Sequence, residues 1–209
     1  MKYDFNSKLM WNLFEGSFYR EFQRLYGEKY ASLVMRNAKR EYIAILGRTE
    51  GIGKNIKENP FIFCFLNCAM LISIYKLVDD RISAEKLGLI YEDVMKDSIL
   101  LKIFCKSKNT FNKKWQVKRY GLGLESQKRK YKNNWVFDLI HDKDEKSYGI
   151  NFYECGICKL CKQEECPELA KQMCKIDYLM AKYMKANLKR TKTIANGDEM
   201  CDFWYSRNK

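Results

Sequence analysis

Residues 135–153 read WVFDLIHDKDEKSYGINFY, and this stretch decides the fold class. Two runs rich in β-branched and aromatic residues, 135–140 and 147–153, flank the polar segment 141–146. A short polar break between two such runs predicts a β-hairpin. The hairpin begins where a helical pattern gives way to a strand pattern, so we expect an α+β protein.

A second pair of strands is predicted near the carboxyl end, at 189–195 and 200–205. Gly197 lies in the polar break between them and can take the positive φ that a tight turn needs. Between the two pairs, residues 166–185 carry apolar side chains at helical spacing, with Pro167 in the first turn. The region 135–209 therefore predicts an antiparallel sheet with one helix that crosses it between the second and third strands.

Helical periodicity extends over residues 7–106, so we expect a helical half that packs on the sheet. Its most apolar run, Phe61 to Tyr75, is fifteen residues long. Because a helix needs about 20 apolar residues to span a bilayer, we interpret this run as a buried helix and expect no membrane partner.

Residues 107–134 separate the two halves, and we interpret them as a basic linker within a single domain, 1–209. From Lys106 to Lys132 ten residues are basic and only Glu125 is acidic, in a chain whose net charge is +13. Interleaved aromatic residues make this run similar to segments that bind single-stranded nucleic acids. No nucleic-acid motif accompanies it, so we do not expect nucleic acid as the partner.

Nine cysteines are the most unusual feature of the composition. The first twelve residues contain no uninterrupted apolar segment after a basic start, so we expect a cytoplasmic protein with reduced thiols. Cys155, Cys158, Cys161 and Cys166 have nearly the spacing of a bacterial ferredoxin run. A second set of cysteines is absent, so we expect no cofactor. The alternative is zinc or an iron–sulfur cluster on these four thiols.

Cys174 and Asp177 are three residues apart on the predicted helix and are therefore neighbours on its surface. A thiol with a carboxylate base in reach is the pairing that nucleophilic or hydrolytic chemistry needs. The alternative is a surface aspartate beside a small buried cysteine, with no catalytic role for either. Arg190, Thr191, Cys201 and Asp202 add polar groups on the last two strands. Strand alternation places Cys201 and Asp202 on opposite faces unless a bulge intervenes.

These residues lie within a longer pattern. In order, it comprises Cys155-Gly156-Ile157-Cys158-Lys159-Leu160-Cys161, Pro167-Glu168-Leu169, Cys174-x2-Asp177, Arg190-Thr191-Lys192-Thr193-Ile194-Ala195, Gly197 and Cys201-Asp202-Phe203. The pattern resembles the L-2-amino-thiazoline-4-carboxylic acid hydrolase family. The resemblance covers Tyr153 to Tyr205, and the preceding helices carry no diagnostic motif. Where the family's last element has arginine, this chain has Trp204, which puts the named substrate in doubt.

The resemblance implies that a 2-aminothiazoline ring is opened by hydrolysis to a carbamoyl-cysteine, so the expected partner is a small-molecule carboxylate. We assign catalysis to Cys174, Asp177 and Cys201, with Asp177 deprotonating a water or a thiol. We assign substrate binding to Cys155, Arg190, Thr191 and Asp202. The order of elements is also similar to 4-vinyl-reductase-type ligand-binding domains, so a sensor that holds a small molecule or a metal without turnover is the alternative.

We further predict that Cys155, Cys174, Asp177, Arg190 and Cys201 converge on one pocket, because the crossing helix brings its polar edge over the later strands. Arg190 would lower the pKa of a nearby thiol, and an ionised Asp177 would oppose that shift. Which effect is larger depends on the distances between these groups.

Overall fold

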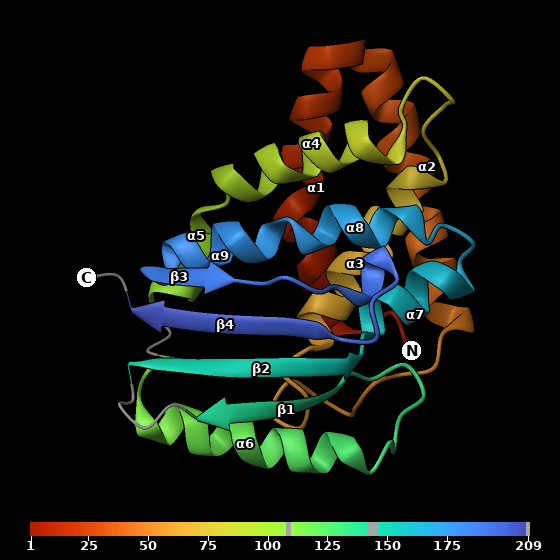
Figure 1. Ribbon diagram of the computed structural model, residues 1–209. Coiled ribbons are helices and arrows are strands. Elements are labelled where there is room, and N and C mark those ends of the chain that lie inside the picture. Colours follow the sequence, from red (N-terminus) through yellow and green to blue (C-terminus); the bar gives the residue numbers. More distant parts are fainter. Residues whose placement is uncertain (108–109, 142–145, 208–209) are drawn as a thin grey trace.

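A computed structural model describes residues 1–107, 110–141 and 146–207 of the chain. Helices make up the amino-terminal half, and a four-stranded antiparallel sheet lies in the carboxy-terminal half (Figure 1). The predicted α+β class is confirmed. In the described part of the chain, no helix is both long enough and apolar enough to cross a membrane.

Five helices form the amino-terminal half: α1 (Phe5–Tyr26), α2 (Glu28–Arg48), α3 (Ile62–Tyr75), α4 (Ala84–Asp97) and α5 (Ile99–Ser107). Gly27 joins α1 to α2 with a φ of 86°, a backbone conformation that favours glycine. Ser83 begins α4, where its side chain accepts a hydrogen bond from the backbone N–H of Lys86. Local sequence signals therefore set the start of α4 and the reversal between α1 and α2.

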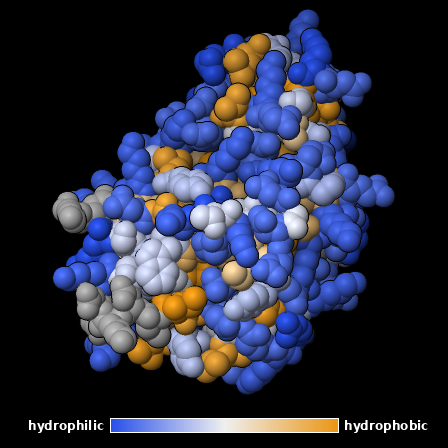
Figure 2. Space-filling model, in the orientation of Figure 1, coloured by the Kyte–Doolittle hydropathy of each residue, from blue (hydrophilic) through white to orange (hydrophobic). Residues whose placement is uncertain are grey.

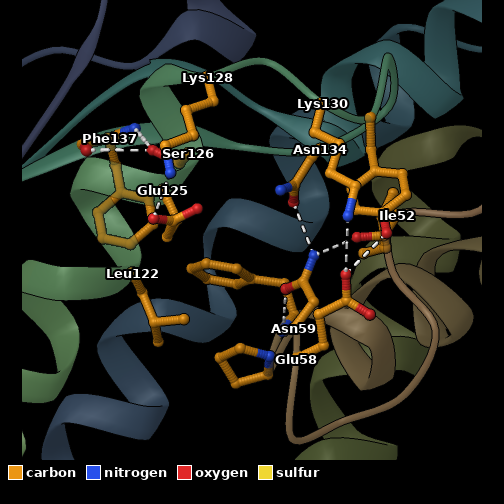
Figure 3. Close-up of a pocket in the computed structure, with 13 residues that line it drawn as sticks. Ile52, Glu58, Asn59, Leu122, Glu125, Ser126, Lys128, Lys130, Asn134 and Phe137 are labelled. Carbon is orange, nitrogen blue, oxygen red and sulfur yellow. Dashed lines mark hydrogen bonds and ion pairs between the residues drawn. The ribbon is translucent and has the colours of Figure 1, made fainter.

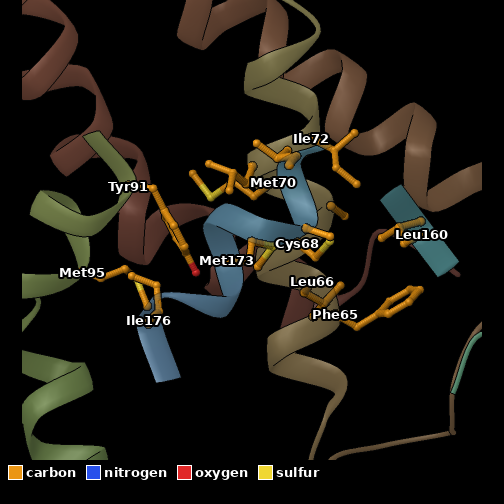
Figure 4. Packing of buried hydrophobic residues seen from close by; sticks show 14 of the residues in the cluster. Phe65, Leu66, Cys68, Met70, Ile72, Tyr91, Met95, Leu160, Met173 and Ile176 are labelled. Carbon is orange, nitrogen blue, oxygen red and sulfur yellow. The ribbon is translucent and has the colours of Figure 1, made fainter. Parts of the chain in front are cut away.

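Helix α3 is the centre of the hydrophobic core, and its residues from Phe65 to Ile74 are all buried. Figure 4 shows Met173, from the carboxy-terminal half, close to Cys68 of this helix, and Ile176 beside Met95 of α4. The polar Asn67 within α3 accepts a hydrogen bond from the Tyr91 hydroxyl at 2.5 Å. Because it is apolar around its whole circumference, α3 can be covered on every side, as the fifteen-residue apolar run predicted.

The sheet has the order β1-β2-β4-β3. Its strands are β1 (Val136–His141), β2 (Ser147–Glu154), β3 (Ala186–Lys189) and β4 (Cys201–Arg207). The predicted strands 135–140, 147–153 and 200–205 agree with β1, β2 and β4. The predicted strand 189–195 was wrong, because the third strand ends at Lys189 and a 3-10 turn occupies Ile194–Asn196.

The cause of this difference is local hydrogen bonding by two aspartates. Asp202 accepts hydrogen bonds from the backbone N–H groups of Thr191 and Lys192, at 2.8 and 2.5 Å. Asp198 accepts from the Thr193 N–H at 2.7 Å. These side chains occupy the donors that a strand would offer to its neighbour, so the segment leaves the sheet.

The two faces of the sheet differ. The residues on its inner face are mostly buried: Phe137, Leu139, Tyr148, Ile150, Phe152, Cys201, Phe203 and Tyr205. On the outer face, Trp204 pairs across the β2–β4 ladder with Gly149 and is 38% exposed. Figure 2 shows mostly hydrophilic residues on this view of the molecule, with small apolar areas over the sheet and the helix beneath it.

Three short helices connect β2 to β3: α7 (Gly156–Gln163), α8 (Glu168–Cys174) and α9 (Ile176–Tyr183). The prediction of one helix over 166–185 was wrong in detail, because the helix is interrupted at Lys175 between α8 and α9. The connection itself lies where it was predicted. Helix α8 packs on α4 and α9 packs on β3, so this connection lies between the sheet and the amino-terminal helices (Figure 1).

The stretch 107–134, interpreted as a linker, contains helix α6 (Lys113–Gln127), which lies along β1 (Figure 1). The Ser126 hydroxyl accepts a hydrogen bond from the Phe137 N–H at 3.0 Å, and the Gln127 amide donates to the Phe137 carbonyl at 3.1 Å. Gly123 permits this approach, since a Cβ there would lie 3.0 Å from the Phe137 carbonyl oxygen. The linker expectation is therefore corrected: this segment is a helix that covers the edge of the sheet.

Candidate active site

An ion pair between Arg190 and Asp177 is the centre of the candidate site. Arg190 Nη1 donates to Asp177 Oδ2 at 2.7 Å, and Nη2 donates to the carbonyl oxygen of Cys174 at 3.0 Å. Asp177 lies in the first turn of α9, and Arg190 directly follows β3. The arginine side chain is 6% exposed, whereas the aspartate side chain is 32% exposed. The arginine is therefore almost fully buried, and the aspartate side chain is mostly buried but keeps an accessible part.

Aromatic rings fix the arginine further. Its guanidinium lies 5.1 Å from the ring centroid of Tyr178 and 4.9 Å from that of Phe203. Phe203 belongs to the inner face of the sheet, so the ion pair faces the same side as Cys201. The Arg190 guanidinium is thus held by the rings of Tyr178 and Phe203. It is also held by acceptors on α8 and α9, the Cys174 carbonyl and the Asp177 carboxylate.

The thiols predicted for the site lie around this ion pair. Cys174 interacts electrostatically with Asp177, Cys155, Arg190 and Cys201. Cys201 interacts in the same way with Cys155, Arg190 and Asp177, and its sulfur accepts a hydrogen bond from the Ile194 N–H at 3.3 Å. Cys174, Asp177, Arg190 and Cys201 therefore lie within electrostatic range of one another, and Cys155 lies within range of the two thiols. Their convergence on one pocket and the role of each stay predictions.

Burial determines the protonation states of these groups. It raises the pKa of the Cys174 thiol far above the usual range, and the nearby Asp177 raises it further. Burial also raises the pKa of Cys201 to about 11. Arg190 acts in the opposite direction on both thiols but has the smaller effect, so at neutral pH the two cysteines are uncharged.

The carboxylate behaves differently from the thiols. Burial raises the pKa of Asp177 to about 6, against the lowering effect of its ion pair and hydrogen bond with Arg190. At neutral pH most Asp177 side chains are therefore ionised, and they hold a proton more strongly than an ordinary aspartate. An accessible carboxylate with a pKa near the working pH is suited to act as a general base.

Thr191 and Asp202, predicted to bind substrate, bind each other in the structure. The Thr191 hydroxyl donates to Asp202 Oδ2 at 2.5 Å, beside the backbone bonds described above. Asp202 alternates with the buried Cys201 and Phe203 along β4, so it lies on the outer face of the sheet. The pair fastens the segment that follows Arg190.

Trp204 also lies on the outer face. Its ring covers Gly149, where a Cβ would be 2.9 Å from the nearest ring carbon. A residue at this position is directed away from Cys201 and Arg190, which belong to the inner side. Trp204 therefore belongs to the outer face, and its consequence for the substrate stays untested.

Hydrogen bonds join the four cysteines proposed as alternative metal ligands in two pairs, and Cys161 also interacts electrostatically with Cys155. Cys155 forms a hydrogen bond with Cys158, whereas Cys161 forms hydrogen bonds with Cys166 and with Cys68 of α3. The Cys68 and Cys161 sulfurs are 3.8 Å apart in the core. Within residues 1–107, 110–141 and 146–207, no three or more His, Cys, Asp or Glu side chains are grouped as a metal site would need.

One buried charge was missed by the sequence analysis, which counted Arg119 only as part of the basic run. In the structure its guanidinium lies 5.0 Å from the ring centroid of Phe61, 5.1 Å from that of Trp115 and 5.7 Å from that of Phe137. Its Nη1 atom is wholly buried and has no hydrogen-bond partner among the described residues. The spacing of Trp115, Arg119 and Leu122 at helical intervals is the signal that could have identified it.

A surface pocket of about 160 Å³ lies elsewhere, between the loop before α3 and the end of α6 (Figure 3). Its polar groups already bind one another: the Asn59 amide donates to Ile52 O at 2.6 Å and to Asn134 Oδ1 at 2.9 Å. None of the cysteines, aspartates and arginines of the candidate site lines it. We therefore do not regard it as the reactive site.

The site contains a carboxylate held by an arginine, with neutral thiols beside it. These groups are suited to a hydrolytic enzyme. The family model for L-2-amino-thiazoline-4-carboxylic acid hydrolase matches residues 66–205, and the chain belongs to this family. The match begins within α3, so it includes helices that carry no recognisable motif. A search of curated proteins gave no match, and a search of solved structures gave none either. The similarity to 4-vinyl-reductase-type domains stays a prediction.

Proposed function

We propose that this protein hydrolyses L-2-amino-thiazoline-4-carboxylic acid, or a closely related cyclic thioimidate, to a carbamoyl-cysteine product. The observation that carries the proposal is Asp177: Arg190 holds it at 2.7 Å, 32% of its side chain is accessible, and its pKa is raised to about 6. Family membership supplies the class of reaction and of substrate.

In the proposed reaction, Asp177 accepts a proton from a water molecule as the water oxygen bonds to the ring carbon between sulfur and nitrogen. The π electrons of the C=N bond move to the ring nitrogen, which takes this proton from Asp177. The hydroxyl of the tetrahedral carbon then gives its remaining proton to Asp177 as the C=O bond forms and the bond to the ring sulfur breaks. The sulfur leaves with the electron pair and receives that proton from Asp177, which gives a free thiol and a carbamoyl group. One water is consumed, and the carboxylate ends in its starting state.

The neutral thiols favour water over cysteine as the attacking group. A cysteine must ionise to act as a nucleophile, and burial raises the pKa of both Cys174 and Cys201. We assign them to the wall of the site, where uncharged S–H groups are weak donors that contact the ring. A covalent cysteine intermediate is the alternative mechanism, and Asp177 would then have to deprotonate a thiol.

We propose that Arg190 binds the general base Asp177 and does not bind the substrate. Two of its nitrogens already bind Asp177 and Cys174, so the carboxylate-binding role expected from the sequence would require breaking these bonds. In the proposed mechanism Arg190 is a positioning residue: it orients the aspartate and favours its ionised form.

The test is turnover of L-2-amino-thiazoline-4-carboxylic acid by the purified full chain, followed by loss of ring absorbance and by release of a free thiol. We expect turnover in the unaltered protein and its loss in Asp177→Asn. Asp93→Asn is the matched control, since Asp93 is an exposed aspartate on α4. Saturable binding of the compound without turnover would contradict the hydrolase proposal and favour a ligand-binding module.

A further inference from the structure

Arg119 carries a buried charge that no described residue pairs. Within residues 1–107, 110–141 and 146–207 no hydrogen bond or ion pair of its guanidinium is found, and Nη1 has no accessible surface. Burial lowers its pKa, with only small opposing effects from Tyr148 and Tyr205. A guanidinium has five donors, and native proteins seldom leave buried donors without acceptors.

The surroundings of Arg119 are aromatic. Phe61, Trp115 and Phe137 all lie within cation–π range of its guanidinium. Ring faces attract a cation, but they do not replace hydrogen-bond acceptors in the plane of the guanidinium. Arg119 as a whole is half-buried, so the residue is not fully enclosed, although Nη1 itself is buried. Two parallel donors in one plane match a carboxylate.

The inner face of the sheet connects Arg119 to the candidate active site. The buried Tyr205 interacts electrostatically with Arg119 and Tyr148, and also with Asp177 and Arg190. Tyr205 stacks on Tyr148 with ring centroids 5.1 Å apart and lies 6.1 Å from Phe203, over which Arg190 lies. The two arginines therefore flank one aromatic surface, with Arg119 on the β1 side and Arg190 on the β4 side.

We infer that Arg119 binds the carboxylate of the substrate. The thiazoline ring of the substrate then lies over the aromatic inner face of the sheet, with the reactive carbon of that ring toward Asp177. The choice of ligand rests on the proposed function. The two arginines then have separate roles, since Arg190 supports the base and Arg119 supplies the cation that a small carboxylate requires. This division also accounts for a charged residue at a position where a leucine would leave no unpaired donor.

Binding is tested by calorimetry in an Asp177→Asn background, where the ligand is not consumed. Replacing Arg119 by glutamine should weaken binding of L-2-amino-thiazoline-4-carboxylate by roughly tenfold or more, because a charged bidentate contact is lost. Lys118→Gln is the matched control, since it removes the same charge from the adjacent, exposed position. The carboxylate-free analogue 2-amino-2-thiazoline should bind equally with and without Arg119.

Turnover separates this inference from the hydrolase proposal. In the otherwise unaltered enzyme, Arg119→Gln should raise KM far more than it lowers kcat, and Arg119→Lys should restore part of the loss. Arg119-dependent binding in a protein that shows no turnover would support the carboxylate subsite and contradict the hydrolase proposal. Full activity at unchanged KM in Arg119→Gln would contradict the subsite and leave the hydrolase proposal intact.

Stability gives an independent readout. If Arg119 serves a ligand, Arg119→Gln should melt at the same temperature as the unaltered protein, or higher, when no ligand is present, and should lose the upward shift that the carboxylate produces. A lower melting temperature with undiminished carboxylate binding would overturn the inference, because Arg119 would then be structural. Absence of binding at millimolar carboxylate, or tighter binding of inorganic phosphate than of the carboxylate, would overturn it as well.

Discussion

Trp204 lies across the β2–β4 ladder from Gly149, and its ring occupies the space where any other residue at 149 would place a Cβ. The contact is on the outer face of the sheet, whereas the candidate active site is on the inner side. Position 204, where the resemblance led us to expect arginine, is thus on the opposite face of the sheet from the candidate active site.

Replacing Trp204 by arginine should therefore leave the hydrolase activity almost unchanged. We expect kcat/KM to stay within about threefold of the unaltered value, since no contact with the inner face is lost. Steady-state kinetics on purified protein measures this. A large fall in kcat/KM without a fall in melting temperature would mean that position 204 reaches the substrate.

Asp177→Asn should remove the fall of kcat/KM at acidic pH, which is the acid limb of the pH profile. Asp177 must be ionised to accept a proton, and its pKa is about 6, so kcat/KM of the unaltered enzyme should fall as the pH drops below about 6. The variant should lose roughly 100-fold or more in kcat/KM at neutral pH, within the usual range for a general base. Its residual activity should show no limb near pH 6, in contrast to Asp93→Asn.

Arg190→Gln should move the acid limb upward. Arg190 lowers the pKa of Asp177 by its charge and by its hydrogen bond, so without it the carboxylate should ionise only at a pH above 6. The kcat/KM profile of the variant, measured from pH 5 to pH 9, gives the shift. A profile with reduced height and an unmoved limb would show that Arg190 does not tune the base.

The cysteines should matter less than the aspartate. Because burial keeps Cys174 and Cys201 protonated, Cys174→Ser and Cys201→Ser should each reduce kcat/KM by roughly tenfold or less. Intact-protein mass spectrometry during turnover should detect no covalent adduct. An adduct that is lost together with activity in one serine variant would identify that thiol as the nucleophile.

Glu164 provides a test of the fold away from the site. Its side chain is 2% exposed and binds Arg48 at 2.5 Å and Lys76 at 2.6 Å. Burial alone would raise the pKa of Glu164, but the hydrogen bonds from the two cations outweigh it and hold the pKa at about 2. Glu164→Gln should therefore lower the free energy of unfolding by about 3 kcal/mol at pH 7.

The pH dependence of this effect has a definite sign. Because the folded-state pKa of Glu164 is below the unfolded one, its stabilisation is present above about pH 4.5 and is lost as the pH falls toward 2. Urea denaturation of the variant and the unaltered protein should therefore give curves that approach each other at acidic pH. Glu165→Gln, at the exposed neighbouring position, should match the unaltered protein throughout.

The sequence predicted the features that depend on local pattern. Two runs of β-forming residues around the polar break at 141–146 identified the first hairpin, and the three-residue spacing of Cys174 and Asp177 placed both on one helical connection. Features that depend on distant partners were missed. The contact between Cys161 and Cys68 joins residues 93 positions apart, and the burial of Arg119 depends on Phe61 and on the strand that α6 covers.

Two errors have one physical source, which is competition by side chains for backbone groups. Asp202 and Asp198 take the donors of the predicted strand 189–195, so only Ala186–Lys189 joins the sheet. Periodicity reports which side chains are apolar, and it does not report such bonds. The same bonds pair Thr191 with Asp202, on the outer face of the sheet, so their substrate-binding role stays a prediction.

The interruption at Lys175 has a consequence for how the base is held. In an unbroken helix the carbonyl of Cys174 would accept a bond from the amide of Tyr178, four residues on. Here that amide turns to the Lys175 carbonyl at 3.3 Å, and Arg190 takes the vacated oxygen. The break thus converts a main-chain group into a second anchor point for the guanidinium. A substitution that made α8 and α9 one continuous helix would remove the hydrogen bond between Arg190 and the Cys174 carbonyl. The Asp177 carboxylate would then be held less firmly.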